Sequence, residues 1–400
     1  MKAVERWWFG WTSPVEMGVF RMLIGFWALV NQIMIGIYFD SWFTQRGFVP
    51  IEVSRAYSGD LPRINFLGGV TDPYVTLGVY ILITIAAFTT CIGFWSRISA
   101  IVLALGIITL HHRNAAILHG GDLVLRMCAI YVALSPCGKA VSVDRLIALW
   151  KGKAPAIPEL VSIWPQRLVQ FQVGLVYFTT VWHKAFGTYW RDGTATWYPL
   201  HLNEFDRFWL PGFMEDGVFI PLTTYGTLAV ELALGTVVFF KAWRKWALLG
   251  GVGLHLFIEY ALNIPLFAFV MVTTYLAFYE GDEISGWAKR VGERLKRFAV
   301  KIRLPHGQTL AAGRGDAVRS MDPFGLVEYS EGAASEWEGE DASGRSRNPF
   351  RLSLMRSIAA WPLALIPGCW RRTLERATTD ATPSSEVRKA KAAKGLEKGG

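Results

Sequence analysis

Long apolar runs separated by short polar connections follow one another through residues 1–280. The longest runs approach the roughly 20 residues that a helix needs to cross the hydrocarbon core of a bilayer. They do not alternate with a period of two, and backbone groups in lipid must be satisfied within the segment, so helices are predicted. The pattern therefore predicts an all-α, polytopic transmembrane helical bundle of about eight spans, at residues 16–39, 74–95, 98–110, 123–134, 168–186, 218–240, 246–262 and 264–279.

The third and fourth of these segments are short. We expect them to continue through polar residues that face the interior of the bundle.

Positive charge gathers in alternate connections of this bundle. Basic residues follow the fourth, sixth and eighth segments, and cytoplasmic loops carry an excess of Lys and Arg. The connection after the fifth segment is instead mainly acidic. Eight spans satisfy this alternation, which predicts a multi-pass protein of the cell membrane with both termini in the cytoplasm. The basic residues predicted to lie on the cytoplasmic side are Lys139, Arg145, Lys151, Lys153, Arg167, Lys241, Arg244, Lys245, Lys289, Arg290, Arg294, Lys296 and Arg297.

The character of the chain changes after Glu280. Residues 1–285 form the predicted transmembrane domain, and residues 286–400 form a cytoplasmic polar tail. The tail begins with an amphipathic basic stretch to Arg303 and continues through a region rich in Gly, Ser and acids at residues 307–348. A short apolar segment near residues 352–370, interrupted by Pro362 and Pro367, predicts a helix at the membrane interface or on a partner. Residues 377–400 are expected to be disordered.

Composition supports the membrane interpretation and excludes other classes. Charged residues make up 18% of the chain, below the roughly 25% of a soluble domain. The net charge of +9 could indicate nucleic acid binding, but the basic residues lie between and after the apolar runs, so we expect the bilayer as partner and no nucleic acid. The four cysteines contain no CxxC pair, which predicts neither a disulfide scaffold nor a zinc ribbon.

Ionisable residues converge at the outer end of the predicted bundle. Such groups are costly at membrane depth and usually face a cavity or a partner, so a site on the outer side is the default hypothesis. Glu231 in the sixth segment is expected to pair with Arg126 or another inward-facing cation. The polar groupings at the outer end are His111-His112-Arg113-Asn114, His119-Gly120-Gly121-Asp122, His183-Lys184 with the following Tyr189-Trp190-Arg191-Asp192-Gly193, and His255.

Each grouping also has a structural explanation. His111 and His112 could cap a helix and bond nearby carbonyls. Asp122, after two glycines, is typical of a tight turn that ends in an N-cap. Lys184 could extend to the interface from a helix end. A single histidine between leucines, such as His255, is more often a core residue than a catalyst.

The pattern does not favour a metal site. Only one dense histidine cluster exists, the remaining histidines are isolated, and few carboxylates lie near them. No metal is therefore expected. The sequence also lacks a nucleophile elbow and a Gly-rich phosphate loop, which disfavours Ser/His/Asp catalysis and nucleotide binding.

An ordered series of motifs over residues 4–280 resembles the horizontally transferred transmembrane (HTTM) family. No single motif is diagnostic, but their order is fairly specific. The series consists of His112-Arg113-Asn114, Gly120-Gly121-Asp122, Leu134-Ser135-Pro136-Cys137-Gly138, Ser142-Val143-Asp144, Arg167-Leu168-Val169-Gln170-Phe171-Gln172, Tyr177, Lys184, Trp190-Arg191-Asp192-Gly193-Thr194-Ala195, Glu231, Arg244 and His255.

That family is similar to the membrane part of vitamin K-dependent γ-carboxylase. In that enzyme a lysine deprotonates a reduced quinone, and oxygen converts the quinone to a strong base that removes a glutamate γ-proton so that carbon dioxide can add. The resemblance implies a reduced vitamin K or menaquinone-type cofactor, Lys184 as catalytic base, and His112 and His255 as catalytic pocket residues. It also implies a substrate or quinone pocket formed by His111, Arg113, Asn114, Asp122, Gln172, Tyr177, Trp190 and Asp192.

The physical chemistry of this assignment is coherent. A dry pocket disfavours the charged form of an amine, which favours its use as a general base. An apolar bundle suits an isoprenoid quinone and excludes water.

The chain departs from the carboxylase after its membrane part. Residues 281–400 form a polar tail with no evident β-rich domain, where the carboxylase has a large lumenal one. Two function classes therefore stay open. One is a lyase-like membrane enzyme acting on a secreted peptide or protein, and the other is a non-catalytic maturation, export or immunity factor for a secreted peptide. A transporter is less favoured, because no inverted repeat or pair of broken helices is visible.

Overall fold

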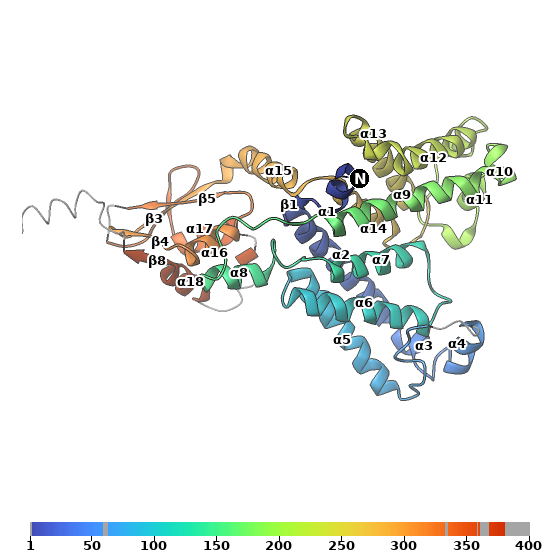
Figure 1. The fold of residues 1–400 in the computed structure, drawn as a ribbon, viewed down its shortest axis with the longest axis horizontal. Coiled ribbons are helices and arrows are strands. Elements are labelled where there is room, and N and C mark those ends of the chain that lie inside the picture. The colour runs from blue at the N-terminus through green and yellow to red at the C-terminus, as the bar shows by residue number, and fades with distance from the viewer. Residues whose placement is uncertain (1, 59–62, 333–334, 358, 361–367, 381–400) are drawn as a thin grey trace, which may run out of the picture. The chain divides into compact units, whose positions relative to one another are not determined.

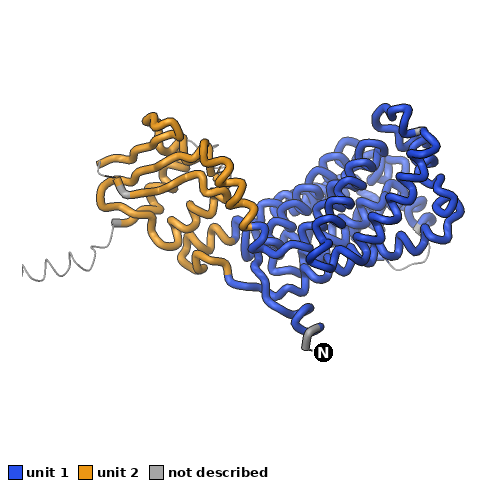
Figure 2. Tube along the Cα trace, turned by 90° about the horizontal axis from the view of Figure 1, so that it is seen from above, with its two compact units in different colours: residues 1–144, 159–284 blue, residues 145–158, 285–400 orange. Residues whose placement is uncertain are grey.

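The computed structural model describes residues 2–58, 63–332, 335–357, 359–360 and 368–380. The chain divides into two compact units, shown in Figure 2. Unit 1 consists of residues 1–144 and 159–284, and unit 2 consists of residues 145–158 and 285–400. Helices predominate over the described residues, which confirms the prediction of a mostly helical fold.

Every apolar segment predicted from the pattern forms a helix in unit 1. The third and fourth are longer than their apolar runs, because α6 begins at Ser96 and continues through His111 and His112 while α7 begins at Gly120. The eight segments correspond to α2 (Val15–Ile37), α5 (Pro73–Ile92), α6 (Ser96–Arg113), α7 (Gly120–Leu134), α9 (Trp164–Ala185), α12 (Phe219–Gly235) with η3 (Val237–Phe239), α13 (Lys241–Ala261), and α14 (Phe267–Thr274) with η4 (Tyr275–Phe278).

Shorter elements lie before and between these helices. They are α1 (Lys2–Phe9), β1 (Trp11–Thr12), α3 (Phe39–Phe43), α4 (Ile51–Ser58), β2 (Val161–Ser162), α10 (Thr188–Arg191), α11 (Trp197–Leu200), η1 (Asn203–Phe205) and η2 (Gly212–Glu215).

The long helices of unit 1 pack as two neighbouring groups (Figure 1). In the first, α2 packs on α5 and α7, and α6 packs on α5 and α7; in the second, α12 packs on α9 and α13, and α13 packs on α14. Helix α14 also contacts α2 and α7, which joins the groups around one hydrophobic core. Gly25 allows α2 to approach α5 closely, since a Cβ there would lie 2.4 Å from the backbone nitrogen of Cys91.

The short strands β1 and β2 hold the beginnings of the two groups together. They pair antiparallel, with Trp11 opposite Ser162 and Thr12 opposite Val161. The backbone nitrogen of Ile163 also donates to the carbonyl oxygen of Gly10 at 2.9 Å. The start of α2 and the start of α9 therefore lie side by side.

Among the described residues, two helices are long and apolar enough to cross a membrane by length and composition, Val15–Ile37 and Pro73–Ile92. Phe219–Gly235 and Phe267–Phe278 are shorter apolar helices.

Unit 2 combines helices with short strands. Its four-stranded sheet has the order β5-β3-β6-β7, in which β3 is parallel to β5 and antiparallel to β6. A second, two-stranded sheet pairs β4 with β8. The elements are α8 (Val143–Trp150), whose first two residues belong to unit 1, then α15 (Gly281–Arg294), which begins in unit 1, η5 (Lys296–Phe298), β3 (Val300–Leu304), β4 (Gln308–Leu310), α16 (Arg314–Ser320), β5 (Val327–Glu331), β6 (Glu338–Glu340), β7 (Ser346–Arg347), α17 (Pro349–Arg356), α18 (Cys369–Ala377) and β8 (Thr378–Asp380).

The strands correct the expectation of a polar tail without β-structure. The amphipathic basic stretch predicted to reach Arg303 ends as helix α15 at Arg294, and β3 begins at Val300. Strand β3 buries Val300, Ile302 and Leu304 and exposes the residues between them, because successive side chains of a strand point to opposite faces.

The apolar segment predicted near residues 352–370 falls partly on α17 and on the first residues of α18, and its residues 358 and 361–367 lie outside the described part. The prediction of disorder from residue 377 is wrong for residues 377–380, because Ala377 ends α18 and Thr378–Asp380 form β8. Residues 381–400 of that segment lie outside the described part.

Candidate functional site

The end of α9 carries Lys184, a charged group with close contacts to residues of other elements. Helix α9 has Pro165 in its first turn, a position where the missing N–H of proline costs nothing. Gln166 and Gln170 donate to the carbonyl oxygen of Ala277 at 2.8 and 2.5 Å, which ties α9 to η4. His183 and Lys184 lie in the last turn, where positive charge complements the helix dipole.

Lys184 forms a bidentate ion pair with Glu231 of α12. The Nζ atom lies 2.6 Å from Oε1 and 2.8 Å from Oε2 of the carboxylate. It also lies 4.3 Å from the centroid of the Trp190 ring, in a cation–π contact. The two charged side chains are 21% and 10% exposed, so water screens the pair only in part. Lys184 therefore does more than extend to the interface from a helix end, because Glu231 and Trp190 hold its ammonium group.

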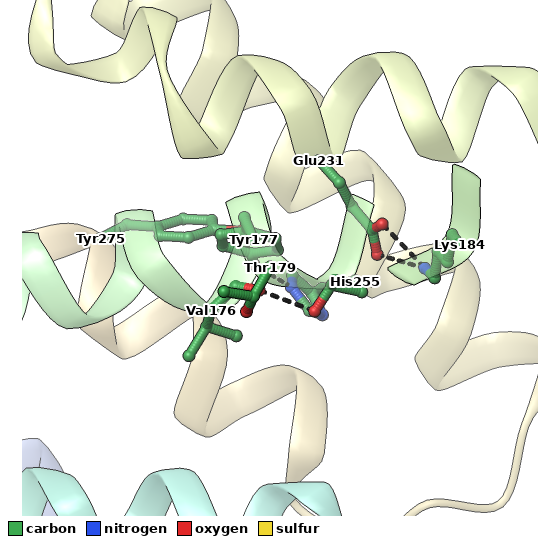
Figure 3. A network of polar contacts seen from close by, with 8 residues as sticks. Val176, Tyr177, Thr179, Lys184, Glu231, His255 and Tyr275 are labelled. Carbon is green, nitrogen blue, oxygen red and sulfur yellow. Dashed lines mark hydrogen bonds and ion pairs between the residues drawn. The ribbon is translucent and has the colours of Figure 1, made fainter. Parts of the chain in front are cut away.

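A buried network of hydroxyl and imidazole groups lies beside the ion pair (Figure 3). The hydroxyl of Tyr177 lies 2.7 Å from Nε2 of His255 and 2.7 Å from the hydroxyl of Tyr275. Tyr177 and Lys184 are seven residues apart on α9 and therefore share one face of the helix. His255 comes from α13 and Tyr275 from η4, so three elements converge on Tyr177.

A glycine on α13, Gly251, leaves room for this network because it has no side chain. A Cβ on Gly251 would lie 2.5 Å from the hydroxyl of Tyr275. The ring of Phe267 meets the His255 ring edge to face, with centroids 5.3 Å apart. Nδ1 of His255 is buried and has no hydrogen-bond partner among the described residues. One imidazole nitrogen therefore stays available for a ligand.

The predicted residues at the end of α6 hold the neighbouring loops. The Arg113 guanidinium is buried and donates to the carbonyl oxygens of Val49 at 2.8 Å and Thr44 at 3.5 Å. The amide of Asn114 donates to the carbonyl oxygen of Trp42 at 2.9 Å. These contacts fix the connection between α3 and α4 on the end of α6, which is a structural role.

The two histidines of this cluster differ from each other. Nδ1 of His112 lies 2.8 Å from the carbonyl oxygen of Ile64. His111 is buried, and its Nδ1 has no partner among the described residues. Within the described residues, neither His111 nor His112 forms a hydrogen bond with Lys184. The structure thus places His111 and His112 in a second polar cluster.

Asp122 caps α7. Its Oδ2 accepts the backbone N–H of His119 at 3.0 Å, and Nδ1 of His119 accepts the N–H of Gly121 at 3.0 Å. Nδ2 of Asn31 donates to Oδ1 of Asp122 at 3.3 Å. The prediction of Asp122 as the N-cap is therefore wrong, because His119 is the N-cap and the two glycines already belong to α7. Asp122 instead occupies the N3 position of a capping box, where its carboxylate still satisfies a backbone N–H at the start of the helix.

The remaining predicted pocket residues separate. Gln172 accepts a hydrogen bond from the hydroxyl of Tyr131 at 3.0 Å. Asp192, at the end of α10, lines an open cavity of about 580 Å³ with Tyr189, Trp197 and Tyr198. Of the predicted set, Lys184, Trp190, Tyr177 and His255 come together, and the others take part in other contacts. No group of three or more His, Cys, Asp or Glu side chains able to hold a metal occurs within the described ranges.

Two residues of this site were not assigned to it from the sequence. Glu231 was expected to need an inward-facing cation, but the pattern did not single out Lys184, which lies 47 residues away on another helix. Tyr275 gave no signal beyond an aromatic residue in an apolar run. Only the fold brings both residues to α9.

Comparison with known proteins gives one match. A family model described as HTTM domain matches residues 9–282. No curated protein and no solved structure matches the chain.

Proposed function

Because the chain belongs to the HTTM domain family, we propose that it is a membrane enzyme that uses a reduced lipid quinone. The family is associated with membrane proteins of the γ-carboxylase type. In this proposal the Lys184–Glu231 pair accepts a proton from the quinol, and the reaction drives oxygenation-coupled carboxylation or related chemistry. The family and the two apolar helices make the chain a membrane protein. The observation that carries the enzymatic proposal is the ion pair beside the Tyr177–His255–Tyr275 network.

Strand pairing supports a multi-pass topology. Because β1 pairs with β2, residues 11–12 and 161–162 must lie on the same side of a membrane. The chain between them therefore crosses an even number of times. Four long helices, α2, α5, α6 and α7, lie in this interval.

Unit 2 supports the same conclusion for the second half. Leu149 is buried, and the guanidinium of Arg314 lies 5.7 Å from the ring of Trp150. The described residues of the two stretches of unit 2 must then share one side, which again requires an even number of crossings. Helices α9, α12, α13 and α14 lie between them. With the charge pattern, this supports eight spans, cytoplasmic termini and an outer position for Lys184.

The residues of the site fit a quinol. A quinol has two hydroxyl groups on an apolar ring and an apolar tail, and His255 offers a buried nitrogen without a described partner next to the Phe267 ring. The helices around it bear apolar side chains suited to the tail. When bound, a quinol supplies an acidic hydroxyl and, after reaction with oxygen, a strong base.

The chain's own groups can move and hold the proton. Glu231 can take a proton from the Lys184 ammonium, which leaves a neutral amine at Nζ. That amine then accepts the proton of an acidic hydroxyl, and the pair has gained one proton in total. The Trp190 ring and the Glu231 carboxyl group stabilise the ammonium that forms.

The neighbouring network positions the reacting group. Tyr177 holds Nε2 of His255, so Nδ1 points away from that contact and can bind a hydroxyl or carbonyl oxygen. Exclusion of water by the surrounding helices protects a reactive base. A secreted peptide or protein is the proposed acceptor, because the proposed topology places the ion pair at the outer end.

Epoxide formation from reduced vitamin K or menaquinone by the purified protein tests this proposal. We expect Lys184→Ala and Glu231→Gln to lower turnover by about 100-fold or more, the usual contribution of a positioned acid–base group. Lys245→Gln, an exposed lysine on α13, is the matched control and should keep wild-type turnover. Circular dichroism verifies folding of each variant.

Absence of turnover by folded wild-type protein with every quinone tested would overturn the proposal. Capture of a secreted peptide partner would then be the next measurement, because it addresses a maturation or immunity factor.

A further inference from the structure

Basic side chains without an ionic partner are concentrated in residues 289–297 of unit 2. All are exposed, and the only acid in this run is Glu293. None forms a hydrogen bond or ion pair with another side chain of the described residues. These side chains are Lys289, Arg290, Arg294, Lys296 and Arg297.

Several other arginines of unit 2 are paired with acids. Arg303 lies 2.9 Å from a carboxylate oxygen of Glu340, and Arg371 lies 2.8 Å from Glu375. Arg319 and Arg347 likewise face Asp316 and Asp341. The five cations of residues 289–297 form no ion pair of this kind with the described residues.

Large apolar side chains are exposed in the same region. Val291 is 41% and Phe298 is 42% exposed. Arg356 of α17 donates from Nε to the carbonyl oxygen of Phe298 at 2.7 Å, and its guanidinium lies 5.8 Å from the Phe298 ring. This contact joins α17 to η5, and the residue before Arg356, Met355, is 52% exposed.

We propose that residues 289–298, together with Met355, form a surface that binds anionic lipid headgroups of the membrane. Each basic side chain near an anionic membrane contributes about fivefold to surface affinity. Exposed Val, Phe and Met side chains suit insertion among the lipids at the headgroup boundary.

The chain itself brings this surface to a membrane. Helix α15 begins at Gly281, shortly after η4 ends at Phe278 in the last apolar segment. Arg290 and Arg294 are four residues apart on α15 and share one face. A soluble acidic partner would need only the charges, whereas a lipid surface also accounts for the exposed Phe298. The inference rests on the membrane location of the chain and not on the proposed proton chemistry.

Hydrogen exchange of the full chain in lipid nanodiscs tests the proposal. Neutral phosphatidylcholine discs are compared with discs that also contain phosphatidylglycerol, at low and at high salt. We expect amides of residues 286–298 to exchange about fivefold or more slowly in the anionic discs, consistent with the affinity per basic side chain. High salt should remove the difference, because it screens exposed charges.

Two sets of variants make the result specific. Arg294→Gln, Lys296→Gln and Arg297→Gln together should abolish the lipid effect. Arg319→Gln, Arg345→Gln and Arg376→Gln change the net charge equally elsewhere in unit 2 and should leave it intact. Val291→Ser with Met355→Ser should weaken the protection that remains at intermediate salt.

Equal exchange in neutral and anionic discs at low salt would overturn the proposal, and so would an equal effect of the two triple variants. Quinone turnover is measured on the same samples. Loss of the lipid effect with unchanged turnover separates this inference from the proposed function.

Discussion

The Lys184 ammonium and the Glu231 carboxylate face each other at 2.6 and 2.8 Å across the contact between α9 and α12. Each charge compensates the other, so the pair does not depend on solvation by surrounding water. Because both lie in largely apolar helices, neither charge is expected to persist without its partner.

The losses of stability caused by removing each member of this pair should not be additive. Lys184→Met or Glu231→Gln alone should cost about 1–3 kcal/mol, less than for a fully buried pair because Lys184 is 21% exposed. The double variant should cost less than the sum of the two single changes. Thermal unfolding in detergent of the wild type and the three variants measures this coupling. Strictly additive losses would show that the ion pair contributes no coupling.

Tyr177→Phe should destabilise the bundle by about 1–3 kcal/mol, because it leaves His255 and Tyr275 without their shared hydroxyl partner. Tyr260→Phe is the matched control. Its hydroxyl donates to the carbonyl oxygen of Trp209 at an exposed position, so its loss should cost about 0.5 kcal/mol. Equal melting temperatures for Tyr177→Phe and the wild type would argue against a tightly held network.

Two adjacent glycines on α13 should respond differently to alanine. A Cβ on Gly251 would lie 2.5 Å from the Tyr275 hydroxyl and 2.9 Å from Cδ1 of Leu234, so Gly251→Ala should cost about 1–3 kcal/mol. A Cβ on Gly250 would meet Val230 at an ordinary 3.4 Å, so Gly250→Ala should be neutral or stabilising. Thermal melts of both variants measure the difference. If Gly251→Ala is as stable as Gly250→Ala, the packing around Tyr275 is looser than described.

The stability of unit 2 should depend on the protonation of Asp322. Burial disfavours its carboxylate and raises its pKa above the usual 3.8, against the Val327 N–H that donates to it at 2.7 Å. The folded state then holds the proton to higher pH than the unfolded state. The stabilisation is complete below the usual pKa and is lost as pH rises through the raised pKa.

Asp322→Asn should remove this dependence, because an amide does not titrate and its oxygen can still accept from Val327. Thermal unfolding followed by circular dichroism at acidic and neutral pH should show a smaller shift in the variant. The same pH dependence in both proteins would assign the effect to other groups.

The helices of unit 1 could be predicted from the sequence because a bilayer demands long apolar segments. The pattern located the eight apolar helical segments from α2 to α14 but not the short helices between them, such as α3, α4, α10 and α11. Strand β3 was missed although its sequence, Val300-Lys301-Ile302-Arg303-Leu304, alternates strictly. The preceding basic helix obscured this alternation, since the same charges fit an amphipathic helical stretch.

The candidate site was predicted only in part. Lys184, Tyr177 and Trp190 lie near one another along the chain, so their grouping follows from helix periodicity and a short connection. The partnership of Lys184 with Glu231 depends on how α9 packs against α12, which a single sequence does not specify. The roles implied for His112 and Gln172 stay predictions, since both side chains bond other partners in the structure.

The division of unit 2 between two distant stretches of chain has a consequence for biosynthesis. A ribosome makes α8 well before α16 and α18, with four long helices of unit 1 synthesised in between. Until the last stretch emerges, Leu146 and Trp150 lack the apolar residues on which they pack in the finished protein. The nascent chain must shield this apolar turn during that interval, so unit 2 can fold only after the intervening helices have been synthesised.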